Sequence, residues 1–479
     1  MLNSHQFYID GTWVNPQNPQ FIDVINPATE TAIVSLALGN AKDVDAAVTA
    51  ARRAFPAFSQ TSVAERMALL QKISVLMKAR FEVLADSMTA EMGAPYTFAR
   101  EGQVASGIEH FDQIINVLGT YAFETHNGTT MVSKEAAGVC GLITPWNWPL
   151  NQIACKVAPA LAAGCTMVLK PSEIAPLSAI VFAEIMHEAG VPKGVFNLVH
   201  GDGPTVGHAL SIHPDVDVMS FTGSTRAGVL VARDAAETVK RVLQELGGNS
   251  ANIVLDDADL ETAVVNGMAG CYLNAGQSCD SPARMLVPHK MMNSAIEIAR
   301  RAAQDYRTGD PRKPKTILGP LVSEAHFNKV QNFIRIGIEE GAELVAGGLG
   351  RPDSISSGYF TKATVFGRVK PEMTIARNEI FGPVLSLIGY DTDEEALKIA
   401  NDTEYGLAGY VQSGNIERAR LIARQLRVGT VQINYPPADY LAPFGGYKRS
   451  GNGREYGAYG LHDYLEIKST VGFGKAEKI

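Results

Sequence analysis

Short apolar strands alternate with helical segments between Val139 and Glu245, and this alternation limits the possible folds more than any other feature of the sequence. Strands joined by helices of this length form a parallel, doubly wound sheet. A second α/β region begins with a strand at 252–255 and continues to about residue 434, with loops and one helix expected at 308–357. The expected strands of the first region span 139–144, 166–170, 195–200, 216–222 and 239–244.

The carboxyl ends of these strands carry residues that suit a ligand site. In doubly wound sheets, ligands bind beyond that edge. Five such residues fall there, namely Asn147, Lys170, Gly201, Gly223 and Glu245. The pattern therefore predicts a binding site along one edge of the first sheet.

The chain is too long for a single hydrophobic core. Its 479 residues indicate two or three domains. Apolar residues recur at helical spacing over 44–58, and Ser62 with Glu65 forms a capping box that predicts the start of a long helical run ending near Gly93.

A thiol and a carboxylate could support covalent chemistry. Cys279 lies in the run Gly276-Gln277-Ser278-Cys279, and Glu245 is followed by Leu246, Gly247 and Gly248. A thiolate can hold an acyl group as a thioester, and a carboxylate can activate the water that removes it. An isolated cysteine is more often a small buried hydrophobic residue, so neighbouring motifs must decide its role.

Composition excludes several classes of protein. The net charge of −8 gives no electrostatic case for a nucleic-acid or membrane partner. The five cysteines are an odd number and form no Cys-x-x-Cys pair, which favours a reducing compartment. We expect no metal site, no signal peptide and a cytoplasmic location, and the apolar stretch 158–169 is too short to span a bilayer.

Seven short motifs, in order, closely resemble those of the aldehyde dehydrogenase superfamily, in its NAD-dependent, non-acylating branch. They lie at 145–149, 170–173, 221–225, 245–248, 276–279, 379–383 and 443–448. The resemblance covers nearly the whole chain and implies two Rossmann-like parallel-sheet domains plus a small β oligomerisation domain. It implies an NAD-binding domain at 1–117 and 138–247, a catalytic domain at 248–446 and an oligomerisation domain at 118–137 and 460–479.

The resemblance also assigns catalytic roles. It implies oxidation of an aldehyde to a carboxylic acid through a thiohemiacetal and thioester on Cys279, with the side-chain amide of Asn147 and the Cys279 N–H stabilising the oxyanion. Glu245 matches the base that activates the hydrolytic water. Lys156 and Glu455 match positions proposed to relay protons behind Glu245, although a plain salt bridge is an equal interpretation.

Cofactor binding follows an atypical pattern, because the segment 201–207 has one residue too many for a Gly-x-Gly-x-x-Gly fingerprint. The resemblance implies that Gly223 and Ser224 open a helix whose N-terminus faces the pyrophosphate. A carboxylate at Glu173 would repel a 2′-phosphate, so NAD is expected over NADP. Phe381 is assigned to the nicotinamide pocket, with a simple core role left open. The other residues implied in cofactor binding are Thr144, Pro145, Trp146, Lys170, Ser172, Gly203, Gly207, Phe221, Thr222, Leu246, Gly247 and Glu379.

The substrate itself is left open. Asp280 directly follows the nucleophile, where a carboxylate would disfavour anionic aldehydes such as succinate semialdehyde and raise the pKa of the thiol. We therefore expect neutral or cationic aldehydes. By resemblance, the substrate tunnel is lined by Trp148, Gln152, Cys155, Ser278, Asp280, Leu441 and Phe444.

The segment 464–471 reads as an exposed, alternating strand whose edge could pair with another chain. With a hairpin near 122–139, it corresponds to the oligomerisation domain of the family, so a homodimer or homotetramer is expected.

Three other functions compete with this interpretation. A thiol hydrolase needs a histidine partner, and His200, His208 and His213 fall in the other predicted domain. A coenzyme-A-acylating dehydrogenase passes the acyl group to coenzyme A instead of water, so a base such as Glu245 would be less necessary. A non-catalytic structural relative would not need Cys279, Glu245 and Asn147 together.

Overall fold

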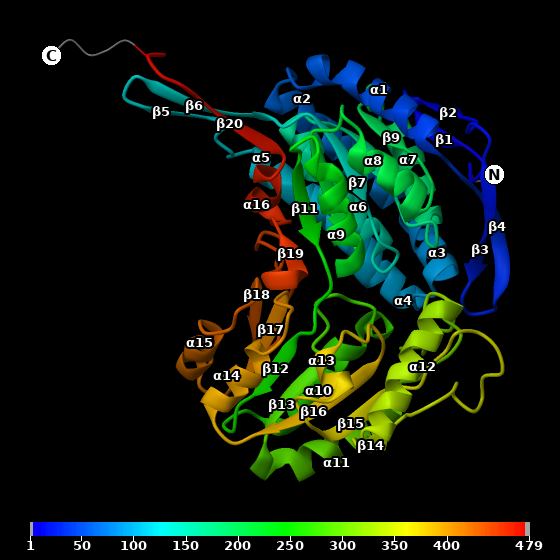
Figure 1. The fold of residues 1–479 in the computed structure, drawn as a ribbon, viewed down its shortest axis with the longest axis vertical. Helices are drawn as coiled ribbons and strands as arrows, with labels where there is room; N and C mark the ends of the chain where they lie inside the picture. The colour runs from blue at the N-terminus through cyan, green and yellow to red at the C-terminus, as the bar shows by residue number, and fades with distance from the viewer. Residues whose placement is uncertain (1–2, 475–479) are drawn as a thin grey trace.

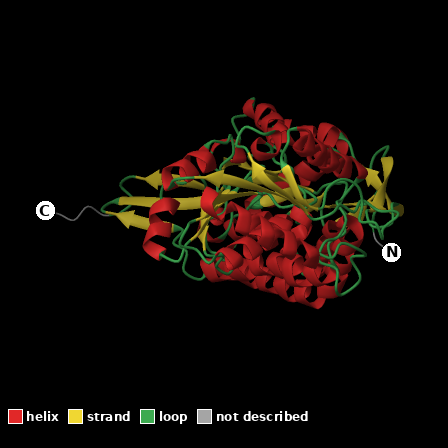
Figure 2. Cartoon of the chain, turned by 90° about the horizontal axis from the view of Figure 1, so that it is seen from below, coloured by secondary structure: helices red, strands yellow, loops and turns green. Residues whose placement is uncertain are grey.

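The computed structural model describes residues 3–474, and helices cover both faces of its central strands (Figures 1 and 2). An eight-stranded sheet has the order β19-β11-β10-β7-β8-β9-β1-β2. Its five central strands are parallel, and its edge strands β1, β2 and β19 are antiparallel to their neighbours. The strands are β1 (Phe7–Ile9), β2 (Thr12–Val14), β7 (Val139–Ile143), β8 (Thr166–Lys170), β9 (Phe196–Leu198), β10 (Val218–Thr222), β11 (Arg241–Glu245) and β19 (Gly451–Asn452).

The second sheet lies in the lower half of Figure 1 and has the order β14-β15-β16-β13-β12-β17-β18. It too is parallel, except for β14 at one edge. Together the two sheets confirm the expected α/β fold with two Rossmann-like parallel sheets. The strands are β12 (Ala251–Val254), β13 (Arg284–Pro288), β14 (Glu343–Ala346), β15 (Thr364–Val369), β16 (Val384–Tyr390), β17 (Ala408–Gln412) and β18 (Thr430–Ile433).

Helices connect the parallel strands. Those of the first sheet are α6 (Pro149–Ala163), α7 (Leu177–Glu188), η2 (Gly203–Gly207), α8 (His208–Ile212) and α9 (Thr225–Ala236). Those of the second are α10 (Leu260–Tyr272), η3 (Leu273–Gly276), η4 (His289–Met291), α11 (Met292–Ala302), η5 (Ala303–Asp305), α12 (Glu324–Glu339), α13 (Thr374–Arg377), α14 (Asp393–Asn401) and α15 (Ile416–Ala423). Short helices η6 (Lys448–Ser450) and α16 (Gly457–His462) follow.

Two details differ from the sequence-based expectations. The interval 308–357 contains the strand β14 besides the helix α12, and this strand was missed because only Val345 in it is buried. Glu245 is the last residue of β11, paired with Thr222, whereas the strand was expected to end at residue 244. The sheet ladder therefore holds the backbone of Glu245 itself.

The N-terminal helices begin as the sequence predicts but are shorter. Ser62 and Glu65 form the capping box, with Ser62 N donating to Glu65 Oε2 at 2.7 Å. The expected single run ending near Gly93 is interrupted at Arg80, whose ψ of 17° breaks the helical backbone. The helices are α1 (Ala41–Phe58), α2 (Val63–Ala79), α3 (Phe81–Met92), α4 (Tyr96–Phe98), the π-helix η1 (Ala99–Val104) and α5 (Ala105–Leu118).

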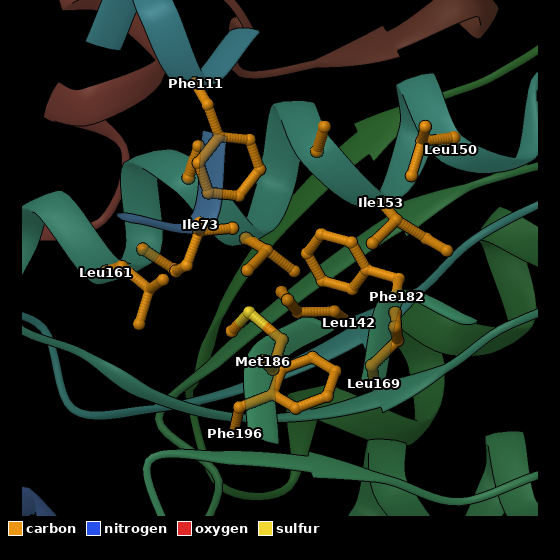
Figure 3. Close-up of a cluster of buried hydrophobic side chains, with 14 of the residues drawn as sticks. Ile73, Phe111, Leu142, Leu150, Ile153, Leu161, Leu169, Phe182, Met186 and Phe196 are labelled. Atoms are coloured by element: carbon orange, nitrogen blue, oxygen red, sulfur yellow. The ribbon is translucent and has the colours of Figure 1, made fainter. Parts of the chain in front are cut away.

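A core of aromatic and aliphatic side chains joins α5, α6 and α7 to the first sheet (Figure 3). The ring centroid of Phe182 lies 6.1 Å from that of Phe111 and 5.8 Å from that of Phe196. Gly107 in α5 lies directly against Leu150, where an added Cβ would come within 2.7 Å of the leucine side chain. This packing fixes the N-terminal end of α6 and, with it, the 144–148 turn that precedes the helix.

A three-stranded sheet of order β20-β6-β5 projects from the body of the molecule (Figure 1). Its strand β20 is an edge with Ile467 58% exposed, as the exposed-strand interpretation of 464–471 predicts. The assignment of residues 1–2 and 475–479 to domains lies outside the described residues. The strands are β5 (Glu124–Asn127), β6 (Thr130–Ala136) and β20 (Leu465–Thr470), and a separate pair is β3 (Gln20–Asn26) with β4 (Thr31–Leu38). Over residues 3–474, no helix is long and apolar enough to cross a membrane.

Candidate active site

Cys279 lies in a tightly turned loop between α10 and β13. The three residues Asn274, Ala275 and Gly276 have φ values of 55°, 56° and 74°, all in the left-handed region. A Cβ on Gly276 would stand 2.1 Å from the carbonyl oxygen of Gly382, so glycine is required there. Cys279 is partly exposed, whereas the other four cysteines are buried. The loop thus presents one accessible thiol.

The 144–148 turn contacts this loop through two side chains. Asn147 Nδ2 donates to the Gln277 carbonyl oxygen at 3.0 Å, and Trp148 Nε1 donates to Ser278 Oγ at 2.8 Å. An amide nitrogen has two hydrogens, so Asn147 keeps a second donor available. The structure therefore brings the predicted oxyanion donor and the predicted nucleophile into one site.

Glu245 is buried and has no hydrogen-bond partner within the described residues. It is 4% exposed, and neither carboxylate oxygen is bonded to protein. The Cα of Gly445 faces it, where an added Cβ would lie 2.7 Å from Oε1. A cavity of ≈ 10 Å³ lined by Glu245, Glu455 and Arg454 has room for about one water molecule. A buried acceptor next to such a cavity suits a residue that binds water.

Burial raises the pKa of Glu245 well above its usual value, and the nearby carboxylate of Glu455 raises it further. Burial likewise raises the pKa of the Cys279 thiol, followed by the effect of Asp280 and then of Glu245. The sequence predicted that Asp280 would raise the pKa of the Cys279 thiol, and the structure gives a shift in the same direction. Burial and the neighbouring carboxylates therefore disfavour the thiolate form of Cys279 in the free protein.

Lys156 and Glu455 form a buried ion pair behind Glu245, with side chains 1% and 11% exposed. The burial of both side chains excludes a surface salt bridge, whereas a purely structural buried pair and a proton relay both fit this arrangement. The thiol of Cys155 lies 3.3 Å from Glu455 Oε2. Cys155, predicted to line the substrate tunnel, therefore contacts the Glu455 side of the site.

The predicted cofactor residues lie along the carboxyl edge of the first sheet. Lys170 Nζ donates to Glu173 Oε2 at 3.1 Å, and Ser224 caps the twelve-residue helix α9. The hydroxyls of Thr144 and Thr222 are buried without a partner among the described residues. Orphaned donors beside a capped helix N-terminus fit a phosphate-bearing, ribose-bearing cofactor.

Glu379 connects this edge to the second sheet. Its Oε1 accepts a hydrogen bond from Gly248 N at 2.8 Å, and a Cβ on Gly247 would stand 2.3 Å from its Oε2. A Cβ on Gly248 would stand 2.2 Å from the Cys279 carbonyl oxygen. Because Gly247 and Gly248 have no side chains, Glu379 and the loop of Cys279 can both pack directly against this backbone.

The remaining predicted cofactor residues surround this edge. Phe381 has a φ of 62°, and its ring meets that of Trp146 edge-on at 5.5 Å. Gly203 and Gly207 bound the short π-helix η2, and an added Cβ on Gly223 would lie 2.6 Å from the Phe221 ring. Pro145, Ser172 and Leu246 lie in the same strand-end segments.

An aromatic group that the sequence did not reveal lies beside the predicted tunnel residues. The ring of Phe444 stacks on Tyr456 at 5.0 Å, and Tyr456 also lies 4.5 Å from the ring of His110. Gln152 is buried, whereas Leu441 is 49% exposed. No motif marks Tyr456 or His110, because they come from distant segments that only the fold brings together.

The thiol-hydrolase alternative gains no support from the site. The groups that shift the pKa of Cys279 are burial and four carboxylates, and none of them is a histidine. His326 instead bonds the Phe381 carbonyl oxygen at 2.7 Å. The histidine partner that a thiol hydrolase needs is therefore not among the groups that act on the Cys279 thiol.

Comparison with known proteins agrees with this geometry. The sequence profile described as "Aldehyde dehydrogenase family" matches residues 13–470. The chain belongs to the aldehyde dehydrogenase family. The resemblance found in its motifs is thereby confirmed, and the relatives of this dehydrogenase are similar over its full length.

One relative is a 3-succinoylsemialdehyde-pyridine dehydrogenase of a Pseudomonas species, 55% identical and aligned over 99% of each chain. Another is a putative aldehyde dehydrogenase of Staphylococcus aureus, 47% identical over 98% of each chain. A crystal structure of a mutant of aldehyde dehydrogenase C from Pseudomonas syringae, complexed with NAD+ and octanal, is 52% identical with a TM-score of 0.99, covering 99% of this chain and 98% of that one.

Proposed function

We propose that this aldehyde dehydrogenase oxidises a neutral aldehyde to the free carboxylic acid, with NAD as the hydride acceptor. The arrangement that carries the proposal is Cys279 in reach of the Asn147 turn, with the unpartnered carboxylate of Glu245 nearby. NAD crystallised with the Pseudomonas syringae enzyme, and the fit of the strand-end residues above supports the same cofactor here.

In the first step, the Cys279 thiol releases its proton to solvent water, and the resulting thiolate attacks the aldehyde carbon and forms a thiohemiacetal. The free Asn147 amide hydrogen stabilises the oxyanion, and losing one such donor costs roughly 2.7–4 kcal/mol of barrier. Bound NAD accepts the hydride that leaves the former aldehyde carbon. A thioester then remains on Cys279.

In the second step, Glu245 removes a proton from the water that hydrolyses the thioester. Its two unpartnered oxygens and the adjacent one-water cavity support this role. A carboxylate poised to activate water favours hydrolysis over transfer to coenzyme A. The buried pair of Lys156 and Glu455 can then pass the proton onward.

Neutral aldehydes and NAD should be the preferred substrates. The carboxylate of Asp280, beside Cys279, repels an anionic aldehyde. The carboxylate of Glu173, beside Lys170, repels the 2′-phosphate of NADP. Octanal, the aldehyde in the Pseudomonas syringae complex, is neutral. In assays of NADH or NADPH formation, kcat/KM should be higher for butanal, a neutral aldehyde of the same chain length, than for succinate semialdehyde, and higher with NAD than with NADP. The reverse order for either pair would contradict the role of the corresponding carboxylate.

The pH dependence should reveal the coupling between Glu245 and Glu455. As a base, Glu245 is active above its pKa, which burial and then Glu455 raise, so kcat should increase with pH in a range above the usual pKa of a glutamate. Glu455→Gln removes the repelling carboxylate, so the rising limb of the kcat profile should move to lower pH. An unchanged limb would show that another group controls it.

The chain is proposed to act as a cytoplasmic homodimer or homotetramer. The exposed edge of β20 supports chain-to-chain pairing through the projecting sheet. We also propose the three-domain division by residue ranges given above, since the strands of the two large sheets and of the projecting sheet fall in these ranges, with the exception of the edge strand β19.

A further inference from the structure

Gln103 occupies an unusual turn next to the active site. It lies in the π-helix η1, and such wide turns occur often at functional sites. The neighbouring Gly102 has no room for a side chain, because a Cβ would stand 2.4 Å from the Phe98 ring. Phe98 in turn meets the Trp148 ring edge-on at 5.3 Å. The π turn is thus packed directly against the turn that carries Asn147.

The side chain of Gln103 joins a closed network of hydrogen bonds around Asn147. Gln103 Nε2 donates to the Asn147 carbonyl oxygen at 3.1 Å and to Asn274 Oδ1 at 3.3 Å. Asn274 Nδ2 donates to the same Asn147 carbonyl at 2.8 Å and to the Gln277 carbonyl at 3.2 Å. Asn147 Nδ2 also donates to the Gln277 carbonyl. The Asn147 turn is therefore bonded to the Cys279 loop through both the backbone carbonyl and the side chain of Asn147.

Packing alone does not explain a glutamine at this position. Gln103 is 0% exposed, and its Oε1 has no partner among the described residues. A buried oxygen without a partner destabilises the fold, so a glutamine at this position is not favoured by burial alone. The donor group of Gln103 is therefore the feature that requires an explanation.

We propose that Gln103 is a positioning residue that holds the backbone of Asn147 so that its amide points at the developing oxyanion. This inference rests on the role proposed above for Asn147. Preorganised donors act only when their geometry is fixed before the reaction, and small displacements cost much of the rate. Two donors on one carbonyl, from η1 and from the left-handed Asn274, provide that fixation.

The test is a double-mutant cycle between Gln103→Met and Asn147→Ala. Gln103→Met keeps the volume and removes the donor, and it should lower kcat about 5- to 30-fold, the effect of one or two lost hydrogen bonds. The KM for NAD and the affinity for NAD should stay unchanged, because none of the four bonded residues of the network is an expected cofactor contact. In the Asn147→Ala background, Gln103→Met should cause no further loss.

Several outcomes separate this inference from the proposed function. Losses that multiply in the double mutant, or a full rate in Gln103→Met, would overturn the inference while the function stands. A full rate in Asn147→Ala would instead overturn the role of Asn147. Gln113→Met, in the same helical segment but bonded to Glu109, is the matched control and should retain the full rate. If Gln103→Met is unstable, Gln103→Asn, which is one methylene too short to reach Asn147, should give the same cycle.

Discussion

Replacing Cys279 by alanine is expected to abolish aldehyde-dependent NADH formation, with a loss on the order of 10⁴-fold or more. The thiol forms both covalent intermediates, so no later step can proceed without it. NAD affinity should stay near that of the wild type, because the predicted cofactor contacts lie on the first sheet and at Glu379. Steady-state kinetics with octanal and calorimetric titration with NAD measure the two quantities.

The matched control is Cys271→Ala. Cys271 is buried in α10 within the core of the second sheet, and its thiol lies 3.6 Å from the Val384 carbonyl oxygen. This variant should lose some stability through the small cavity but keep its turnover. Equal activity in Cys279→Ala and the wild type would contradict the assignment of the nucleophile.

Replacing Glu245 by glutamine should separate the two chemical steps. Hydride transfer precedes hydrolysis, so the variant should release a burst of about one NADH per active site and then turn over 10²–10⁴-fold more slowly, the usual contribution of a general base. Glutamine keeps the size of the side chain and fills the same buried position at the end of β11. Rapid-mixing measurements of NADH absorbance resolve the burst from the slow phase.

Glu372→Gln, an exposed carboxylate in the loop after β15, serves as the control and should behave as the wild type. Full steady-state turnover in Glu245→Gln would show that another base hydrolyses the thioester. Loss of the burst itself would show that Glu245 acts before hydride transfer, on the thiol.

Residues at strand ends could be predicted from the sequence because local patterns place them. Lys170 ends β8 and Glu245 ends β11, so periodicity alone puts both at one edge of the sheet. The same pattern places Asn147 beyond the end of β7. Cys279 required a motif, because the left-handed residues Asn274, Ala275 and Gly276 that shape its loop give no simple sequence signal.

Residues that act through tertiary contacts could not be predicted. Gln103 reaches Asn147 only because a π turn and Gly102 let two segments approach, and nothing in the helical periodicity of this region marks it. The stacking of Phe444 on Tyr456 likewise depends on chain segments folded beside α5. The break at Arg80 was missed because amphipathic spacing continues across it, while the backbone dihedral angles do not.

The central claim is that Cys279 carries the acyl group that Glu245 hydrolyses. Mass spectrometry of Glu245→Gln, quenched in acid after incubation with octanal and NAD, tests it most directly. We predict that one octanoyl group is attached per chain and that peptide mapping places it on Cys279. NADH formation with Cys279 unmodified, or with the acyl group on another residue, would contradict the account.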